Sequence, residues 1–124
     1  MKKLIIILCA FVASLGLISC GSSNTPSGVV KEYYKALSAG KYEKAVSMTT
    51  MTDQENIKGY AEKLESVGYK VSSYEILSET IADDGENAVV EVKIATSTTE
   101  EPTPKEETKK VRLKKMDGKW RIHL

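Results

Sequence analysis

Between residues 26 and 68 the apolar residues recur at helical spacing. The first group follows intervals of three and four residues: Val30, Tyr33, Tyr34 and Leu37. This spacing predicts a helix over 26–39 with one buried face. Thr25 suits the capping position, Pro26 suits the first turn, and Gly40 is the expected stop.

Two further helices are predicted before residue 69. A short one is expected to bury Tyr42, Ala45, Val46 and Thr49. The next is expected to begin at Thr52, because Thr52 and Glu55 have the spacing of a capping box, in which each side chain satisfies a free backbone donor. Its predicted core face holds Ile57, Tyr60, Ala61, Leu64 and Val67, and Gly68 ends it.

After Gly68 the period of the pattern changes to two, which indicates strands. One strand is expected over 69–81, a turn at 83–86, and a second strand over 87–97. In the second strand four apolar residues alternate with their neighbours: Ala88, Val90, Val92 and Ile94. Residues 98–106 contain two prolines and no large apolar side chain, which predicts an exposed loop.

The last hairpin is predicted over 107–116 and 119–124, around Asp117-Gly118. Asp-Gly as a two-residue loop favours a type I′ turn. The resulting register joins three pairs on one face: Val111 with Leu124, Leu113 with Ile122, and Lys115 with Trp120. The opposite face collects a basic stripe of Lys110, Arg112, Lys114, Arg121 and His123. Such a stripe is usually solvated, and it also suits anionic head groups or an acidic partner.

The register of the first hairpin stays open. A two-residue loop places Glu75 and Glu79 opposite apolar positions of the following strand, whereas a three-residue loop places Tyr74 and Ile76 there. We expect a bulge in this hairpin. An inward Glu75 or Glu79 is a candidate general base, and an outward one is an ordinary surface carboxylate.

The first twenty residues have the pattern of an export signal. Lys2 and Lys3 precede an apolar run over 4–18, which is short of the ~20 residues that span a bilayer as a helix. A retained short anchor is the alternative. Leu17-Ile18-Ser19-Cys20 resembles the bacterial lipobox, and this resemblance implies cleavage before Cys20, a diacylglycerol on its thiol, and acylation of the new amine by a chain such as palmitate.

Three regions follow from this interpretation. A lipoprotein signal peptide covers 1–19, a lipidated Cys20 with a polar, flexible tether covers 20–27, and a single domain covers 28–124. Lipid anchoring places the protein in the bacterial cell envelope. Gly21 is not acidic, so the periplasmic face of the outer membrane is the expected location in a Gram-negative host.

The composition excludes several kinds of binding and catalysis. The 124 residues carry 18 basic and 17 acidic side chains, and a net charge of +1 argues against nucleic-acid binding. Cys9 lies in the removed segment and Cys20 is lipidated, so no thiol remains for a disulfide, a nucleophile or a metal. His123, the only histidine, is expected on a solvated strand. We therefore expect no metal, no cofactor and no catalytic residue.

Three segments carry a resemblance to a known superfamily. They are Val29-Val30-Lys31-Glu32-Tyr33-Tyr34-Lys35-Ala36-Leu37, Gly40-Lys41-Tyr42-Glu43-Lys44-Ala45, and Val111-Arg112-Leu113 through Asp117-Gly118-Lys119-Trp120-Arg121-Ile122. Together they resemble the nuclear-transport-factor-2-like superfamily, and within it small bacterial lipoprotein domains of unknown function. The resemblance implies an α+β cone, in which N-terminal helices pack in a curved antiparallel sheet and leave a pocket at the wide end. It implies no single activity, since relatives include ketosteroid isomerase, polyketide cyclases, dehydratases and non-catalytic modules.

The aromatic residues suggest what such a pocket holds. Five of them are candidates to line it: Tyr33, Tyr34, Tyr60, Tyr74 and Trp120. The alternative is that these amphipathic rings build an ordinary core. We predict a non-catalytic binding or interaction module whose partner, besides the membrane, is a small apolar ligand or an envelope protein. Two other hypotheses remain, an isomerase-like or dehydratase-like enzyme with a glutamate base, and a homodimer formed through the outer sheet face.

Overall fold

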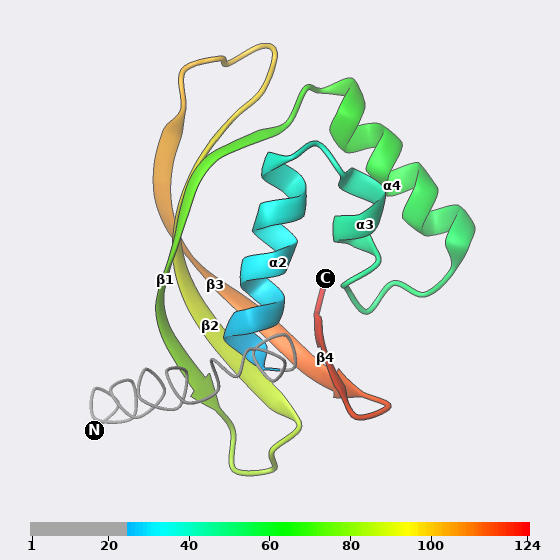
Figure 1. The fold of residues 1–124 in the computed structure, drawn as a ribbon, viewed down its shortest axis with the longest axis vertical. Helices are drawn as coiled ribbons and strands as arrows, with labels where there is room; N and C mark the ends of the chain where they lie inside the picture. Colours follow the sequence, from blue (N-terminus) through cyan, green and yellow to red (C-terminus); the bar gives the residue numbers. More distant parts are fainter. Residues whose placement is uncertain (1–24) are drawn as a thin grey trace.

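The computed structural model describes residues 25–124; the predicted signal peptide, Cys20 and most of the predicted tether lie outside them. In this part of the chain three helices precede a four-stranded antiparallel sheet with the strand order β1-β2-β3-β4 (Figure 1). The elements are α2 (Pro26–Ser38), α3 (Tyr42–Val46), α4 (Gln54–Ser66), β1 (Lys70–Ile81), β2 (Asn87–Ser97), β3 (Lys105–Met116) and β4 (Lys119–Ile122). The predicted α+β class is confirmed.

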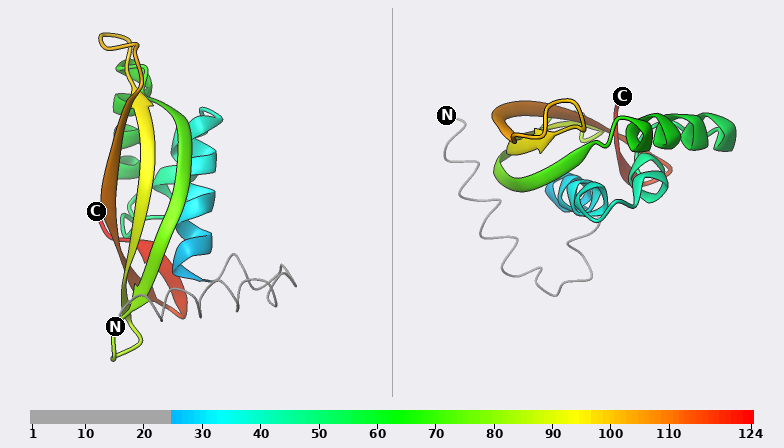
Figure 2. Two further views of the ribbon diagram at one scale, coloured as in Figure 1. Left: turned by 90° about the vertical axis from the view of Figure 1, so that its left-hand side faces the viewer. Right: turned by 90° about the horizontal axis from the view of Figure 1, so that it is seen from above.

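The sheet curves around α2, which lies against its concave face, and α3 and α4 lie on the far side of α2 from β1 (Figures 1 and 2). The main core lies between the sheet and α2. Its fully buried members include Val30, Leu37, Val90, Val92 and Ile94. A second cluster of Val46, Ile57 and Ala61 joins α3 to α4. The alternating pattern of 87–97 therefore marks the face of β2 that packs on α2, as predicted.

The start of α2 is fixed by its own cap and by β1. The Thr25 hydroxyl accepts a hydrogen bond from the Gly28 amide at 3.0 Å, and Pro26 occupies the first turn, as predicted. From the sheet, Glu79 Oε1 accepts hydrogen bonds from the amide and the hydroxyl of Ser27, at 2.9 and 2.5 Å. A carboxylate is favourable at a helix N-terminus, because free amides and the helix dipole meet it there.

The predicted beginning of α4 was wrong. The capping residue is Asp53, not Thr52: Asp53 Oδ1 accepts from the Glu55 amide at 3.1 Å, and its Oδ2 accepts from the Asn56 side chain at 3.2 Å. Both residue types cap well, and a carboxylate also complements the positive end of the helix dipole. Asp53 therefore caps the helix, and the predicted capping box of Thr52 and Glu55 does not form.

At the other end of α4 the prediction for Gly68 is confirmed and the prediction for Val67 is wrong. Val67 was expected in the core and is 44% exposed, because the helix ends at Ser66 and Val67 no longer follows its apolar face. Gly68 stops the helix as predicted, with φ of +66°. A Cβ at Gly68 would also lie 2.1 Å from the Thr99 hydroxyl, so the loop over 98–104 packs closely on this turn.

The last hairpin has the predicted register. Leu113 pairs with Ile122 and Lys115 pairs with Trp120. Asp117 and Gly118 have φ of +53° and +78°, as a type I′ turn requires. β4 ends at Ile122, two residues earlier than expected.

In the first hairpin the expected bulge is present and combines the two open registers. Near the turn Glu79 pairs with Val90, as the two-residue loop predicts. The register then shifts between Ile76 and Ser78. Beyond this shift Tyr74 pairs with Ile94, as the three-residue loop predicts.

Candidate functional site

A cavity of about 440 Å³ lies between α2, α4, the inner face of β3 and the end of the chain. We call it the cone cavity. Apolar side chains of Leu37, Leu64, Val111, Ile122 and Leu124 contribute to its lining. Four tyrosines also line it, namely Tyr33 and Tyr34 from α2, Tyr60 from α4, and Tyr69 from the residue before β1, and Lys109 and Lys110 of β3 complete it. An apolar lining with a few polar tips is typical of a small-molecule site.

The hydroxyls of Tyr33, Tyr34 and Tyr69 in the cone cavity stay neutral at physiological pH. Burial raises the pKa of Tyr33, Tyr34 and Tyr69 above the ordinary value, and the neighbouring phenols raise it further. The rings of Tyr33 and Tyr34 meet edge to face with centroids 5.1 Å apart. Neutral phenols both donate and accept hydrogen bonds, so this lining can hold a polar group of a mostly apolar ligand.

These raised pKa values predict a loss of stability in alkali. An unfolded tyrosine loses its proton near pH ~10, whereas Tyr33, Tyr34 and Tyr69 keep theirs in the folded protein. The stabilisation is therefore complete below pH ~10 and is lost as the pH rises above it, by up to ~1.4 kcal/mol per pH unit and group. Urea unfolding between pH 8 and 11, with tyrosinate absorbance at 295 nm, measures it. If all six tyrosines ionise together near pH ~10, the prediction is wrong.

Charged residues of β3 lie at the cone cavity, and the sequence pattern had not assigned them to it. Lys109 lines the cavity, and its ammonium lies 3.9 Å from the Glu107 carboxylate. The negative charge of Glu107 also contributes to the raised pKa of Tyr34 and Tyr69. The signal was available, because residues 107 and 109 share strand parity with the inward Val111 and Leu113. Lys110 lines the cavity as well, so two ammonium groups stand at its rim, and Glu107 is paired with the first of them.

The structure separates the predicted pocket residues. Tyr33, Tyr34 and Tyr60 lie together in the cone cavity. Tyr74 lies on the inner face of β1 and stacks on Tyr34, with centroids 6.3 Å apart, but it does not line the cavity. Trp120 lines a different pocket.

The two glutamates considered as bases do not line the cone cavity. Glu75 is exposed and pairs with Lys93 across the outer face of β1 and β2. Glu79 faces inward, but the amide and hydroxyl of Ser27 bind its carboxylate. His123, exposed beyond β4, donates its backbone amide to Arg112 at 2.8 Å. Among residues 25–124 no three His, Cys, Asp or Glu side chains gather as metal ligands.

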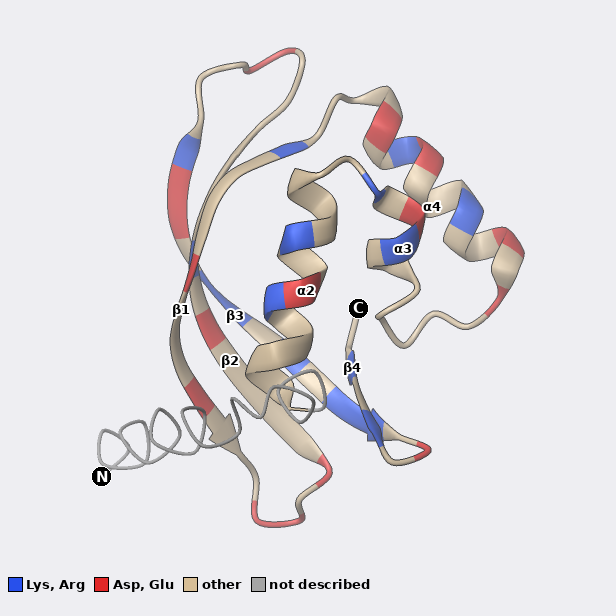
Figure 3. Ribbon diagram, in the orientation of Figure 1, with Lys and Arg blue, Asp and Glu red and all other residues tan. Residues whose placement is uncertain are grey.

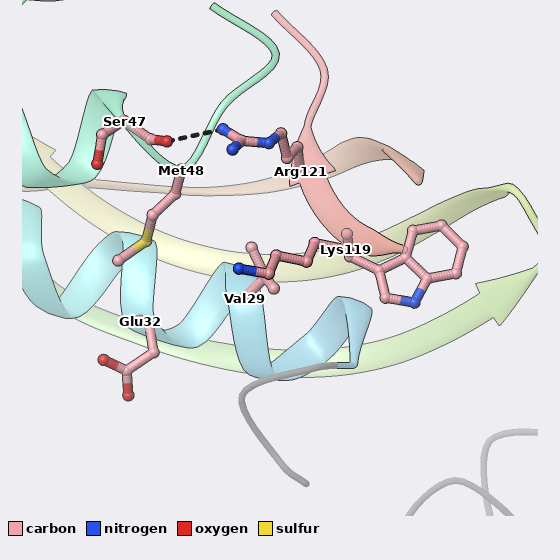
Figure 4. A pocket seen from close by; sticks show the side chains of 7 residues that line it. Val29, Glu32, Ser47, Met48, Lys119 and Arg121 are labelled. Atoms are coloured by element: carbon pink, nitrogen blue, oxygen red, sulfur yellow. Dashed lines mark hydrogen bonds between the residues drawn. The ribbon is translucent and has the colours of Figure 1, made fainter. Parts of the chain in front are cut away.

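A second, smaller pocket of about 220 Å³ lies between α2, the end of α3 and β4 (Figure 4). We call it the side pocket. Its lining residues are Val29, Glu32, Ser47, Met48, Lys119, Trp120 and Arg121. It shares no lining residue with the cone cavity. Three segments far apart in the sequence build it, and no local pattern identified it.

The predicted basic stripe is divided in the structure. On the outer face Lys110 pairs with Glu91 and Arg112 with Val89 across β2 and β3. Arg121 instead turns to the segment after α3, where its Nη1 donates to the carbonyls of Ser47 and Thr49. The lower half of β3 carries most of the remaining positive charge of this surface (Figure 3).

Comparison with known proteins identifies the fold. No protein-family model and no curated protein matches the chain. A solved protein with a ketosteroid isomerase-like fold from Catenulispora acidiphila, in complex with trimethylamine, is 15% identical, with 80% of this chain and 85% of that chain covered and a TM-score of 0.60. A SEC-C motif containing protein from Rhodopseudomonas palustris is 12% identical, with 82% and 77% covered and a TM-score of 0.62.

The chain therefore has a ketosteroid isomerase-like α+β fold. At these identities the likeness is one of fold alone. In the part of the chain that the structure describes, each helix is too short or too polar to cross a bilayer.

Proposed function

We propose that this protein is a lipid-anchored binding module of the bacterial cell envelope, which holds a small, largely apolar ligand in the cone cavity without chemical conversion. The observation that carries the proposal is the cavity itself, about 440 Å³ lined by apolar side chains, four tyrosines and two lysines. That volume lies within the range of small-molecule sites. The apolar lining provides affinity through the hydrophobic effect, and the hydroxyls orient the ligand.

The chemistry of the lining favours binding over catalysis. A general base must lie within hydrogen-bond reach of the proton that it removes. The phenols of Tyr33 and Tyr34 have raised pKa values and are poor bases at neutral pH. Glu79, the inward candidate, is engaged at the start of α2. The trimethylamine complex of the Catenulispora protein supports the idea that this fold accommodates a small ligand.

The anchor supports the same function. Between the proposed lipidated Cys20 and the cap of α2 at Thr25, the chain reaches at most about 18 Å when fully extended. So short a tether would hold the cavity close to the bilayer, where apolar ligands concentrate. Tethering would also raise the effective concentration of the protein toward envelope partners.

Native mass spectrometry of the protein isolated from its host membranes tests the proposal. We expect a discrete added mass on the folded chain. Leu64→Trp places a bulky ring into the cavity lining and should remove that mass, whereas Glu62→Trp, at an exposed position of α4, should retain it. A bare chain, or an added mass that both variants retain, contradicts a ligand in the cone cavity.

A further inference from the structure

The side pocket combines an apolar lining with charges of both signs. Val29, Met48 and Trp120 supply the apolar surface, Glu32 stands on the α2 side, and Lys119 and Arg121 extend from β4 (Figure 4). The volume of about 220 Å³ equals roughly seven water molecules at ~30 Å³ each. This space suits a small organic molecule of fewer than about ten heavy atoms.

The carboxylate in this pocket lacks a partner. Glu32 is half-buried, and within residues 25–124 it makes neither a side-chain hydrogen bond nor an ion pair. A partly desolvated charge is stabilised by an opposite charge beside it. Glu32 is the carboxylate that lines this pocket, and a cationic group bound there would stabilise it.

The two basic side chains on the β4 side of the pocket can also bind a ligand. Arg121 is held in place because its Nη1 donates to the carbonyls of Ser47 and Thr49, at 3.0 and 3.1 Å. Its Nε and Nη2 make no hydrogen bond with the described residues. Lys119 extends over Val29 in Figure 4 and likewise has no ion pair among residues 25–124. A guanidinium fixed by two carbonyls is a preorganised donor for a carboxylate.

These charges determine the class of ligand. A simple anion would pair with Arg121 and Lys119 but would leave Glu32 unpaired, and a simple cation would leave both basic side chains unpaired. A zwitterion with its charges at the two ends of a short apolar chain satisfies both groups, and its chain contacts the apolar side chains that line the pocket. We propose that the side pocket binds a small ω-amino acid, with its carboxylate at Arg121 and Lys119 and its ammonium at Glu32.

The position of the only tryptophan provides a direct test. Trp120 lines the side pocket and is absent from the lining of the cone cavity, so its fluorescence reports on this site alone. The full chain, purified in detergent, is titrated with 5-aminopentanoate and 6-aminohexanoate. We expect a saturable change in emission. Pentanoate and pentylamine, which each lack one of the two charges, should need at least tenfold higher concentrations.

A variant pair checks the role of the carboxylate. Glu32→Gln should raise the half-saturating concentration of 5-aminopentanoate at least tenfold, whereas Glu62→Gln, an exposed glutamate of α4, should leave it unchanged. The proposal is overturned if neither amino acid gives a saturable change, if pentanoate binds equally well, or if Glu32→Gln binds like the native chain. Should Glu32→Gln lose its fold by circular dichroism, the comparison of the four ligands on the native chain decides.

Discussion

Replacing Leu113 with alanine is expected to lower the free energy of unfolding by about 3 kcal/mol. Leu113 is 2% exposed and lies at the centre of the sheet, between Ala88 on β2 and Ile122 on β4. Truncation removes the buried methyl groups and leaves a cavity that strands paired on both sides cannot easily close. Domains of this size have a total stability of about 5–15 kcal/mol, so the loss is a large fraction.

Urea denaturation of residues 25–124 measures this loss. Val89→Ala is the matched control, because Val89 lies on the same sheet but is 36% exposed on its outer face. We expect the control to change stability by less than about 1 kcal/mol. Equal losses at the two positions would mean that the outer face of the sheet is also covered, as in a homodimer.

The last hairpin was predictable because short-range chemistry determines it. Asp117 and Gly118 both adopt positive φ, which Asp-Gly tolerates, and the turn then fixes every later pair. Alternation confirms the same register independently, since Leu113, Trp120 and Ile122 fall on the buried face. When turn chemistry and apolar pattern agree, the sequence is sufficient.

The first hairpin was not predictable in this way, because contacts with another element determine its register. Near the turn Glu79 faces inward and reaches Ser27 at the start of α2. Further along, Tyr74 and Ile76 must face inward to pack on the core. A strand of period two can satisfy both only through the shift between Ile76 and Ser78. The sequence indicated a bulge, but its position depends on where α2 lies.

The candidate site was likewise predictable only where the local sequence pattern determines which residues face inward. Helical spacing placed Tyr33 and Tyr60 on inward faces, and both line the cone cavity. The spacing could not show that Trp120 lies in a different pocket, since that depends on how α2 and α3 pack beside β4. The side pocket was missed for the same reason, because residues 29–32, 47–48 and 119–121 meet only in the folded chain.

Changing Cys20 to serine is expected to abolish lipid attachment completely, the largest effect that we predict. The lipobox-like Leu17-Ile18-Ser19-Cys20 offers one thiol at the cleavage point, and a hydroxyl does not replace the thiolate as the nucleophile that accepts a diacylglycerol. Each buried methylene of an acyl chain contributes ~0.8 kcal/mol to membrane binding, and a single chain already binds only marginally. Without any lipid group, the mature domain should therefore be released from detergent-phase and membrane fractions. Incorporation of labelled palmitate in bacterial cells and the intact mass of the protein measure the change.

Cys9 supplies the matched control, because it is the only other cysteine and lies in the segment that cleavage before Cys20 would remove. Cys9→Ser should retain the palmitate label, the acylated mass and the membrane fraction of the native chain. Label that persists in Cys20→Ser would place the lipid elsewhere, and a native chain without label would favour a retained apolar anchor at 4–18. In that second case the cone cavity would still lie beside the membrane, but the apolar segment itself would hold it there.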